Sequence, residues 1–239
     1  PSVDDVIIVS GTTTPIVKLV DTFILDSARR TWTNRDIEPR RFVFEANAGV
    51  TGLNYQRLKE IFYPNEGYEI IENELALNKH RHCYASLGSL VANEKSPVTK
   101  GGFVFTVPVP HELSRSSFVW ATLLDIAFSI AENYKILEEI AGHKADYVWA
   151  CGGGLQSATL RQLIANIIQK KIKVRQGFQQ SSAVGGAIIC NEAIQRGTRQ
   201  IKDEVETISP QISEAENFQQ LYKEWKDTRS YFRKLSGAE

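Results

Sequence analysis

Short apolar runs alternate with longer amphipathic stretches along the chain, which predicts a protein built from both strands and helices. The runs rich in Val and Ile are typical of buried strands, and apolar residues that recur every three or four positions are typical of helices. The predicted strands cover 6–9, 16–20, 41–47, 146–150, 172–175 and part of 101–108. The predicted helices cover 53–62, 117–141, 158–168, 182–193 and 213–235. Strands dominate the first third and alternate with helices in the last, so we expect a mixed sheet flanked by helices.

Two stretches carry less pattern. Residues 29–41 are polar and charged, which predicts an excursion over the surface, and residues 66–117 give no clear periodicity. His80 and His82 lie in the second stretch, but no third ligand follows at useful spacing. We therefore expect both histidines on the surface and no metal site formed by this chain.

Composition narrows the possible partners. Lys and Arg together number 28, as do Asp and Glu, so the net charge is zero and a nucleic acid or anionic membrane is a poor fit. No apolar stretch reaches the roughly 20 residues needed to span a bilayer. The three cysteines are widely spaced and fit neither a disulfide framework nor a zinc pattern. We interpret them as reduced, buried thiols of a cytoplasmic protein.

Three consecutive glycines, Gly152, Gly153 and Gly154, separate the predicted strand 146–150 from the predicted helix 158–168, whose N-cap is Ser157. Glycine allows unusual backbone dihedrals and the close approach of a ligand. The start of a helix offers free N–H groups and the positive end of a dipole, which suits a nucleotide. Many α/β proteins use such a turn only to pass from strand to helix, so both readings stay open at this point.

A second candidate lies at the first turn of the chain. Gly11, Thr12 and Thr13 join two predicted strands, and their N–H and hydroxyl groups could bind an anion such as phosphate. Threonines are also common at strand ends for structural reasons. Further along, Gly52 and Gln56 are separated by one helical turn and could line a pocket together, or Gln56 could be a solvated helix residue.

The predicted helix 182–193 is rich in small residues, including Gly185 and Gly186. Small side chains let a helix pack closely against a sheet or another helix. We therefore expect this helix to pack against the body of the protein.

Taken together, these segments resemble the carboxy-terminal lobe of the FGGY carbohydrate kinases, such as the xylulokinases and glycerol kinases. The stretch 152–166 is similar to the glycine-rich adenosine motif of that family, and 183–187 is similar to its Ala-x-Gly-Ala-Ala segment. The turn 10–13 resembles its Gly-Thr phosphate hairpin, followed by 52–56 where a Gly-x-x-x-Gln is expected. The resemblance implies an actin-like ATPase domain of the ribonuclease H-like class, over nearly the whole chain 1–239.

The resemblance also implies roles for individual residues. Thr12, between Gly11 and Thr13, would donate to the terminal phosphate of ATP, and Gly52 and Gln56 would lie beside the nucleotide. The adenosine pocket would be bounded by Gly153 and Ser157 and shaped by Gly152 and Gly154. ATP with Mg²⁺ is the implied cofactor, a sugar or polyol is the implied substrate, and a homo-oligomer is possible. Such donors suit phosphoryl transfer, which depends on positioning and charge stabilisation.

One part of the family pattern is missing from the sequence. The catalytic base of the family is an aspartate in the amino-terminal lobe, and here Asp4 and Asp5 lie too close to the hairpin to take that role. We therefore expect the amino-terminal, sugar-binding lobe to lie outside this chain and the isolated chain to be inactive. Two alternatives stay open: a stand-alone, non-catalytic actin-like module that binds a nucleotide or a partner, and another ATPase of the same fold.

Overall fold

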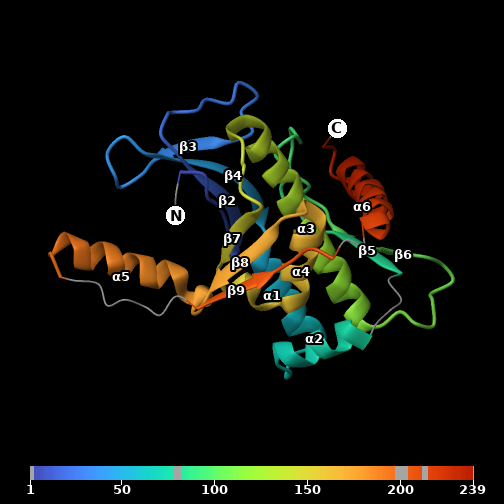
Figure 1. The fold of residues 1–239 in the computed structure, drawn as a ribbon. Coiled ribbons are helices and arrows are strands. Elements are labelled where there is room, and N and C mark those ends of the chain that lie inside the picture. The colour runs from blue at the N-terminus through green and yellow to red at the C-terminus, as the bar shows by residue number, and fades with distance from the viewer. Residues whose placement is uncertain (1–2, 78–81, 197–203, 212–214, 239) are drawn as a thin grey trace.

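The computed structural model describes residues 3–77, 82–196, 204–211 and 215–238. Within these ranges, seven strands form one mixed sheet in the order β3-β4-β2-β1-β7-β8-β9, and β5 and β6 form a separate small sheet (Figure 1). The strands are β1 (Val6–Val9), β2 (Thr13–Val20), β3 (Trp32–Arg35), β4 (Phe42–Val50), β5 (Cys83–Ser86), β6 (Gly102–Phe105), β7 (Tyr147–Cys151), β8 (Lys171–Arg175) and β9 (Val205–Ile208). The helices are α1 (Gly52–Phe62), α2 (Tyr68–Leu77), α3 (Arg115–Ala141), α4 (Ala158–Ile168), α5 (Ser181–Ala193) and α6 (Ala215–Leu235).

Strand β1 lies at the centre of the large sheet. It pairs antiparallel with β2 through the first turn of the chain and parallel with β7, with Val9 opposite Cys151. Because parallel strands end at the same edge of a sheet, the residues after β1 and those after β7 lie side by side. This edge brings the two predicted turns together.

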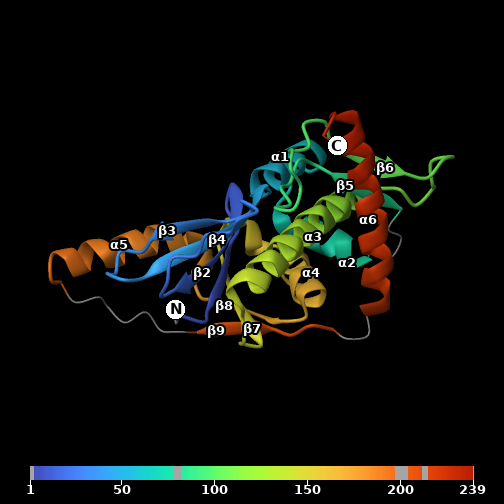
Figure 2. The same ribbon diagram turned by 90° about the horizontal axis from the view of Figure 1, so that it is seen from above.

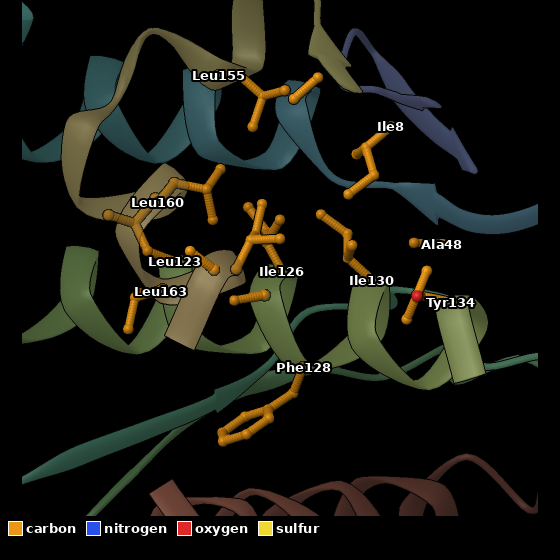
Figure 3. Packing of buried hydrophobic residues seen from close by; sticks show 14 of the residues in the cluster. Ile8, Ala48, Leu123, Ile126, Phe128, Ile130, Tyr134, Leu155, Leu160 and Leu163 are labelled. Carbon is orange, nitrogen blue, oxygen red and sulfur yellow. The ribbon is translucent and has the colours of Figure 1, made fainter. Parts of the chain in front are cut away.

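The core lies between the large sheet and a layer of helices, with α1, α3 and α4 on the same side of the sheet (Figure 2). Figure 3 shows Ile8 of β1 facing Leu123, Ile126 and Ile130 of α3, with Leu155 from the glycine turn in the same cluster. Each of these side chains is almost fully buried. Such a residue typically contributes about 1.5–3 kcal/mol relative to an exposed one, so the core fixes the turn at Leu155.

Helix α6 packs over β5 and is tied to α3 by a buried polar network. Trp225 donates from Nε1 to Oδ1 of Asp125 at 2.8 Å, and Arg229 binds both carboxylate oxygens of Glu94 at 2.7 Å. Burial raises the pKa of the Asp125 carboxyl, although the guanidinium of Arg229 opposes that shift. The prediction of an amphipathic helix in the tail is confirmed, while its predicted start at Ser213 lies outside the described residues, as does His80.

The predicted strands and helices are all present, with ends that differ by a few residues. The sequence analysis missed four elements. Strand β3 lies in the stretch 29–41, which was predicted as a surface excursion, and α2 and β5 lie in the unpatterned stretch 66–117. Strand β9 forms the far edge of the sheet against β8. None of the helices in the described ranges is long and apolar enough to cross a membrane.

The prediction that the small-residue helix packs against the body of the protein is wrong for the described structure. Helix α5 has no buried residue and projects away from the sheet (Figure 1). A Cβ atom on Gly185 or Gly186 would meet nothing within 4 Å. The physical reason is that the apolar residues of α5 are spread around the whole circumference of the helix, so they form no single face to bury. Cys190 lies on α5 and is exposed, so the prediction of three buried thiols is also wrong.

Candidate functional site

The ends of β1 and β7 are joined by backbone hydrogen bonds to Ser10, the residue that follows β1. Its N–H donates to the carbonyl of Cys151 at 2.8 Å, and its carbonyl accepts from the N–H of Gly154 at 2.9 Å. The first bond continues the parallel ladder beyond β1. The second links the hairpin to the glycine turn directly.

The hairpin tip is held from the other side by the start of α1. The carbonyl of Thr12 accepts from the N–H groups of Thr51 and Leu53, at 3.2 and 3.4 Å. A Cβ on Gly52 would lie 2.0 Å from the carbonyl oxygen of Gly11, so only glycine permits this approach. Gly11 and the side chains of Thr12 and Thr13 are left exposed at the tip.

Thr14 anchors the hairpin beneath this exposed tip. Its buried hydroxyl lies 2.6 Å from the hydroxyl of Thr51 and donates to Oγ of Ser10 at 3.2 Å. Because buried hydroxyls need partners, these three side chains fix the position of the tip relative to α1.

The glycine turn begins at Gly152, whose φ of +100° is one that L side chains rarely adopt. A Cβ on Gly152 would stand 2.3 Å from the carbonyl oxygen of Ser10, and one on Gly154 would stand 2.4 Å from its Oγ. Both glycines are therefore required by the contact with Ser10. Between them, Gly153 is exposed, and the atom nearest to an added Cβ would be Nε2 of Gln156 at 3.8 Å.

Helix α4 begins immediately after this turn, and the N–H groups of Thr159 and Leu160 in its first turn already have partners. Oγ of Ser157 accepts from the N–H of Leu160 at 3.1 Å, which confirms the predicted N-cap. The carboxylate of Glu72, on α2, accepts from both the N–H and the hydroxyl of Thr159, at 3.0 and 2.7 Å. An acidic side chain at a helix start is favourable. Glu72 thus already places a carboxylate at this helix start.

Tyr55 on α1 lies against the same buried region. Only 4% of its surface is exposed, and its ring centroid is 5.7 Å from that of Tyr68. Burial raises the pKa of the Tyr55 phenol, and the nearby carboxylate of Glu72 adds to the shift. The side chain is therefore neutral, and it connects α1 with the elements that carry Glu72 and Ser157.

Arg161 supports the glycine turn from α4. Its Nη1 donates to the carbonyls of Leu155 and Gln156, at 2.7 and 3.3 Å, and its guanidinium lies 5.6 Å from the ring centroid of Phe178. The backbone carbonyl of Phe178 accepts from the N–H of Gly152 at 2.7 Å. The sequence analysis assigned no role to Arg161, although its place one helical turn after the N-cap was a usable signal. Glu72 gave no signal, because it lies in the unpatterned stretch.

The predicted site residues therefore fall into two groups at one edge of the sheet. Gly11, Thr12, Thr13 and Gly52 form the hairpin side, and the second group is Gly152, Gly153, Gly154 and Ser157. Gln56 is exposed on α1, one turn beyond Gly52, and donates to Glu60 at 3.1 Å. Hydroxyl and N–H groups dominate the exposed tip, which suits an anion, and the exposed Gly153 leaves open space for a flat group.

The structure thus combines a mixed seven-stranded sheet, with α1, α3 and α4 on one side, and a hairpin and a glycine turn that meet at one edge. The sequence model of the FGGY family of carbohydrate kinases, C-terminal domain, matches residues 69–194. The chain belongs to this family. The predicted fold class, an actin-like ATPase domain with a mixed sheet flanked by helices, is confirmed.

Individual relatives agree with the family. The chain is 47% identical over 238 residues to the protein YoaC of Bacillus subtilis (strain 168), covering 99% of this chain and 47% of YoaC. It is similar to the crystal structure of xylulose kinase from Rhodospirillum rubrum, with a TM-score of 0.72, 17% identity and coverage of 99% of this chain and 49% of that one. It is also similar to Plasmodium falciparum glycerol kinase with ADP, with a TM-score of 0.68, 14% identity and coverage of 94% and 47%. The chain spans about half the length of these relatives.

Proposed function

We propose that the chain is the ATP-binding lobe of a kinase that phosphorylates a sugar or polyol hydroxyl. The observation that carries the proposal is the double contact of Ser10, which joins the exposed threonine hairpin to the glycine turn. A phosphate group and an adenosine could then occupy one edge of the sheet together. The glycerol kinase of Plasmodium falciparum, which has the same fold, was solved with ADP.

The two groups of residues support different parts of the nucleotide. Thr12 would donate its hydroxyl to the terminal phosphate, with the exposed hydroxyl of Thr13 as a further donor. Gly11 would lie beside the phosphate and shape the tip, since its N–H already donates to the carbonyl of Thr13 at 3.0 Å. Gly52 and Gln56 would lie beside the phosphates, since α1 begins at the hairpin.

The glycine turn would hold the adenosine. The start of α4 already binds the carboxylate of Glu72, so a second anion there would meet like charge. This favours adenosine near Gly153 and Ser157, with Gly152 and Gly154 shaping the turn, and phosphates at the hairpin. Gly153 is exposed, and an added Cβ there would meet only Nε2 of Gln156, at 3.8 Å, so the turn is accessible to a ligand.

Mg²⁺ would enter with the phosphates, because this ion usually keeps several waters and is bound by substrate phosphates and few protein ligands. Bound Mg²⁺ neutralises charge on the transferred phosphate. We assign the catalytic base and the sugar-binding residues to a second lobe outside this chain, so the isolated chain binds nucleotide without transferring phosphate. A protein that uses ATP and carries free cysteines fits the cytoplasm.

The test is calorimetric titration of ADP into the wild-type chain and the variant Gly153→Glu. The added side chain would enter the open space at the turn and exclude adenosine without a clash inside the fold. We expect ADP binding to be lost while the melting temperature is retained. Ala193→Glu on the exposed end of α5 adds the same charge elsewhere and serves as the matched control. Normal ADP binding by Gly153→Glu would overturn the adenosine assignment.

A further inference from the structure

A cleft of about 300 Å³ lies between α1 and the loop 87–101, which joins β5 to β6. Helix α1 contributes Asn54, Arg57 and Leu58 to its lining. The loop contributes Leu87, Gly88, Val98, Thr99 and Gly101. This volume is at the lower end of the range of small-molecule sites, so the cleft has room for a small ligand.

The loop wall of the cleft is anchored near both ends. The N–H of Leu87 donates to Oδ2 of the buried Asp125 on α3, at 3.2 Å. The N–H groups of Thr99 and Lys100 donate to Oγ of Ser236, just beyond α6, at 3.1 and 3.0 Å. The fold itself therefore positions this wall.

Two glycines bring the ends of the loop together. Gly88 has a φ of +79°, and a Cβ there would lie 3.5 Å from the carbonyl oxygen of Val98. A Cβ on Gly101 would lie 2.4 Å from the carbonyl oxygen of Ser86. Glycine permits both approaches, and neither position places a side chain in the cleft.

The cleft and the proposed nucleotide site use different sides of α1. Successive residues of an α-helix are rotated by about 100° around its axis. Gly52 and Gln56 therefore share one side of the helix. Asn54, Arg57 and Leu58 share the side roughly opposite. The two sites are separate, although both are built on this helix.

Arg57 gives the cleft its charge. Among the described residues that line the cleft, it alone is charged. Its exposed guanidinium has no hydrogen bond or ion pair with any other described residue. A guanidinium binds a carboxylate or phosphate group through two parallel N–H donors. The cleft therefore favours an anion.

Much of the remaining lining is apolar. Leu58 and Leu87 are half-buried, and Val98 is buried. The exposed hydroxyl of Thr99 can exchange a hydrogen bond with a polar group of a ligand. A bare inorganic ion would leave the apolar part of the lining uncovered. An anion with a compact organic body would cover it, which is favourable because apolar surface leaves water.

We propose that this cleft binds a small organic anion. Arg57 holds its carboxylate or phosphate group, and its body covers Leu58, Leu87 and Val98. The proposal does not rest on the assignment of the nucleotide site, because none of these residues belongs to that site.

The test is a titration of the full-length protein that carries this chain, followed by ligand-observed NMR. The probes are benzoate and phenyl phosphate, which share a ring and differ in the anionic group, and uncharged phenol as the control. We expect phenol to bind at least about tenfold more weakly than the better of the two anions, which identifies the preferred group. Binding of the anion should persist in saturating ADP. Displacement by ADP would place the probe at the nucleotide site and overturn the proposal.

Variants assign the binding to Arg57. Arg57→Gln should raise the dissociation constant of the bound anion at least about tenfold, whereas Arg35→Gln on the exposed strand β3 should leave it unchanged. Both positions are exposed, so the melting temperatures should stay close to that of the wild type. A wild-type protein that binds neither anion would overturn the proposal. Equal binding of phenol, or an anion that binds Arg57→Gln as tightly as the wild type, would overturn it as well.

Discussion

The carbonyl oxygen of Ser10 accepts the N–H of Gly154 at 2.9 Å, and it also stands 2.3 Å from where a Cβ on Gly152 would lie. One backbone group thus fixes the distance between the first hairpin and the glycine turn. The turn needs glycine at two positions for contact with Ser10, and has glycine at a third position that the fold itself leaves open.

The three glycines should therefore respond differently to the same substitution. Gly152→Ala places a Cβ against backbone at a strained φ, so we expect the free energy of unfolding to fall by about 2 kcal/mol or more. Gly153→Ala should change it by less than about 0.5 kcal/mol, because its Cβ would meet only Nε2 of Gln156, at an ordinary contact distance of 3.8 Å. Thermal unfolding of both variants measures the difference. Equal losses would contradict the assignment of the contacts around Ser10.

Thr12 and Thr14 lie on the same hairpin, but substitutions at the exposed Thr12 should affect nucleotide binding and those at the buried Thr14 should affect protein stability. Under the proposed function, Thr12→Val removes an exposed hydroxyl that would donate to a charged phosphate, a bond worth about 1.5–3 kcal/mol. ATP binding should then weaken by at least about tenfold, with unfolding unchanged. Thr14→Val leaves the hydroxyls of Ser10 and Thr51 without their buried partner and should cost about 1–3 kcal/mol of stability. Calorimetry and thermal unfolding distinguish the two. A loss of stability without a loss of affinity in Thr12→Val would refute the phosphate role.

Glu72, on α2, should influence the proposed nucleotide site. In Glu72→Ala the N–H and hydroxyl of Thr159 lose their acceptor, so α4 shifts more freely and ADP binds more weakly. The exposed helix start should also gain affinity for inorganic phosphate, which a purely structural loss would not produce. Titration of ADP and of phosphate measures both effects, with the exposed Glu69→Ala on the same helix as the control. Unchanged binding of both ligands would show that Glu72 has no influence on the site.

His143 should make stability depend on pH. Its Nδ1 lies 2.8 Å from the hydroxyl of Tyr134, which donates to Glu138, so the proton sits on Nδ1. Nε2 is buried and has no hydrogen-bond partner in the described structure, so a proton added there would find no acceptor. Burial, followed by the charge of Lys170, lowers the pKa of the imidazole.

Because the folded state favours the neutral imidazole of His143, it binds fewer protons than the unfolded state, and the free energy of unfolding rises with pH. Stability is fully present above the ordinary histidine pKa of about 6.5 and is lost as the pH falls below it. We expect the melting temperature to fall between about pH 7 and pH 5, and this slope to flatten in His143→Gln. The exposed His111→Gln is the control and should keep the wild-type slope. An unchanged slope in His143→Gln would exclude His143 as its source.

The local sequence pattern was sufficient to predict the helices and strands that bury one regular face. The stripe on α3 and the N-cap of α4 at Ser157 could be predicted because both signals lie within a few consecutive residues. Strands β3 and β9 are short, mostly exposed edge strands, so their residues need no apolar alternation. Helix α5 has the composition of a packed helix but meets no partner in the described structure, and no local pattern reports that.

The candidate site divides in the same way. The glycines and threonines could be predicted as turn residues, and the resemblance to the family gave them roles. Glu72 could not be predicted, because its importance arises from a contact with Thr159 on a distant helix. Likewise, the requirement for glycine at position 52 depends on the carbonyl of Gly11, which no nearby residue reveals.

The parallel pairing of β1 with β7 also bears on how the protein folds. These strands are neighbours in the sheet but are separated along the chain by most of the other elements. Their pairing closes a long loop and is slow to form, so the two halves of the site meet only when the chain is nearly folded. A nucleotide that contacts both halves would bind the folded state alone and raise its thermal stability. The apparent affinity for the ligand would then report the fraction of molecules in which β1 and β7 are paired, even for variants altered far from the site.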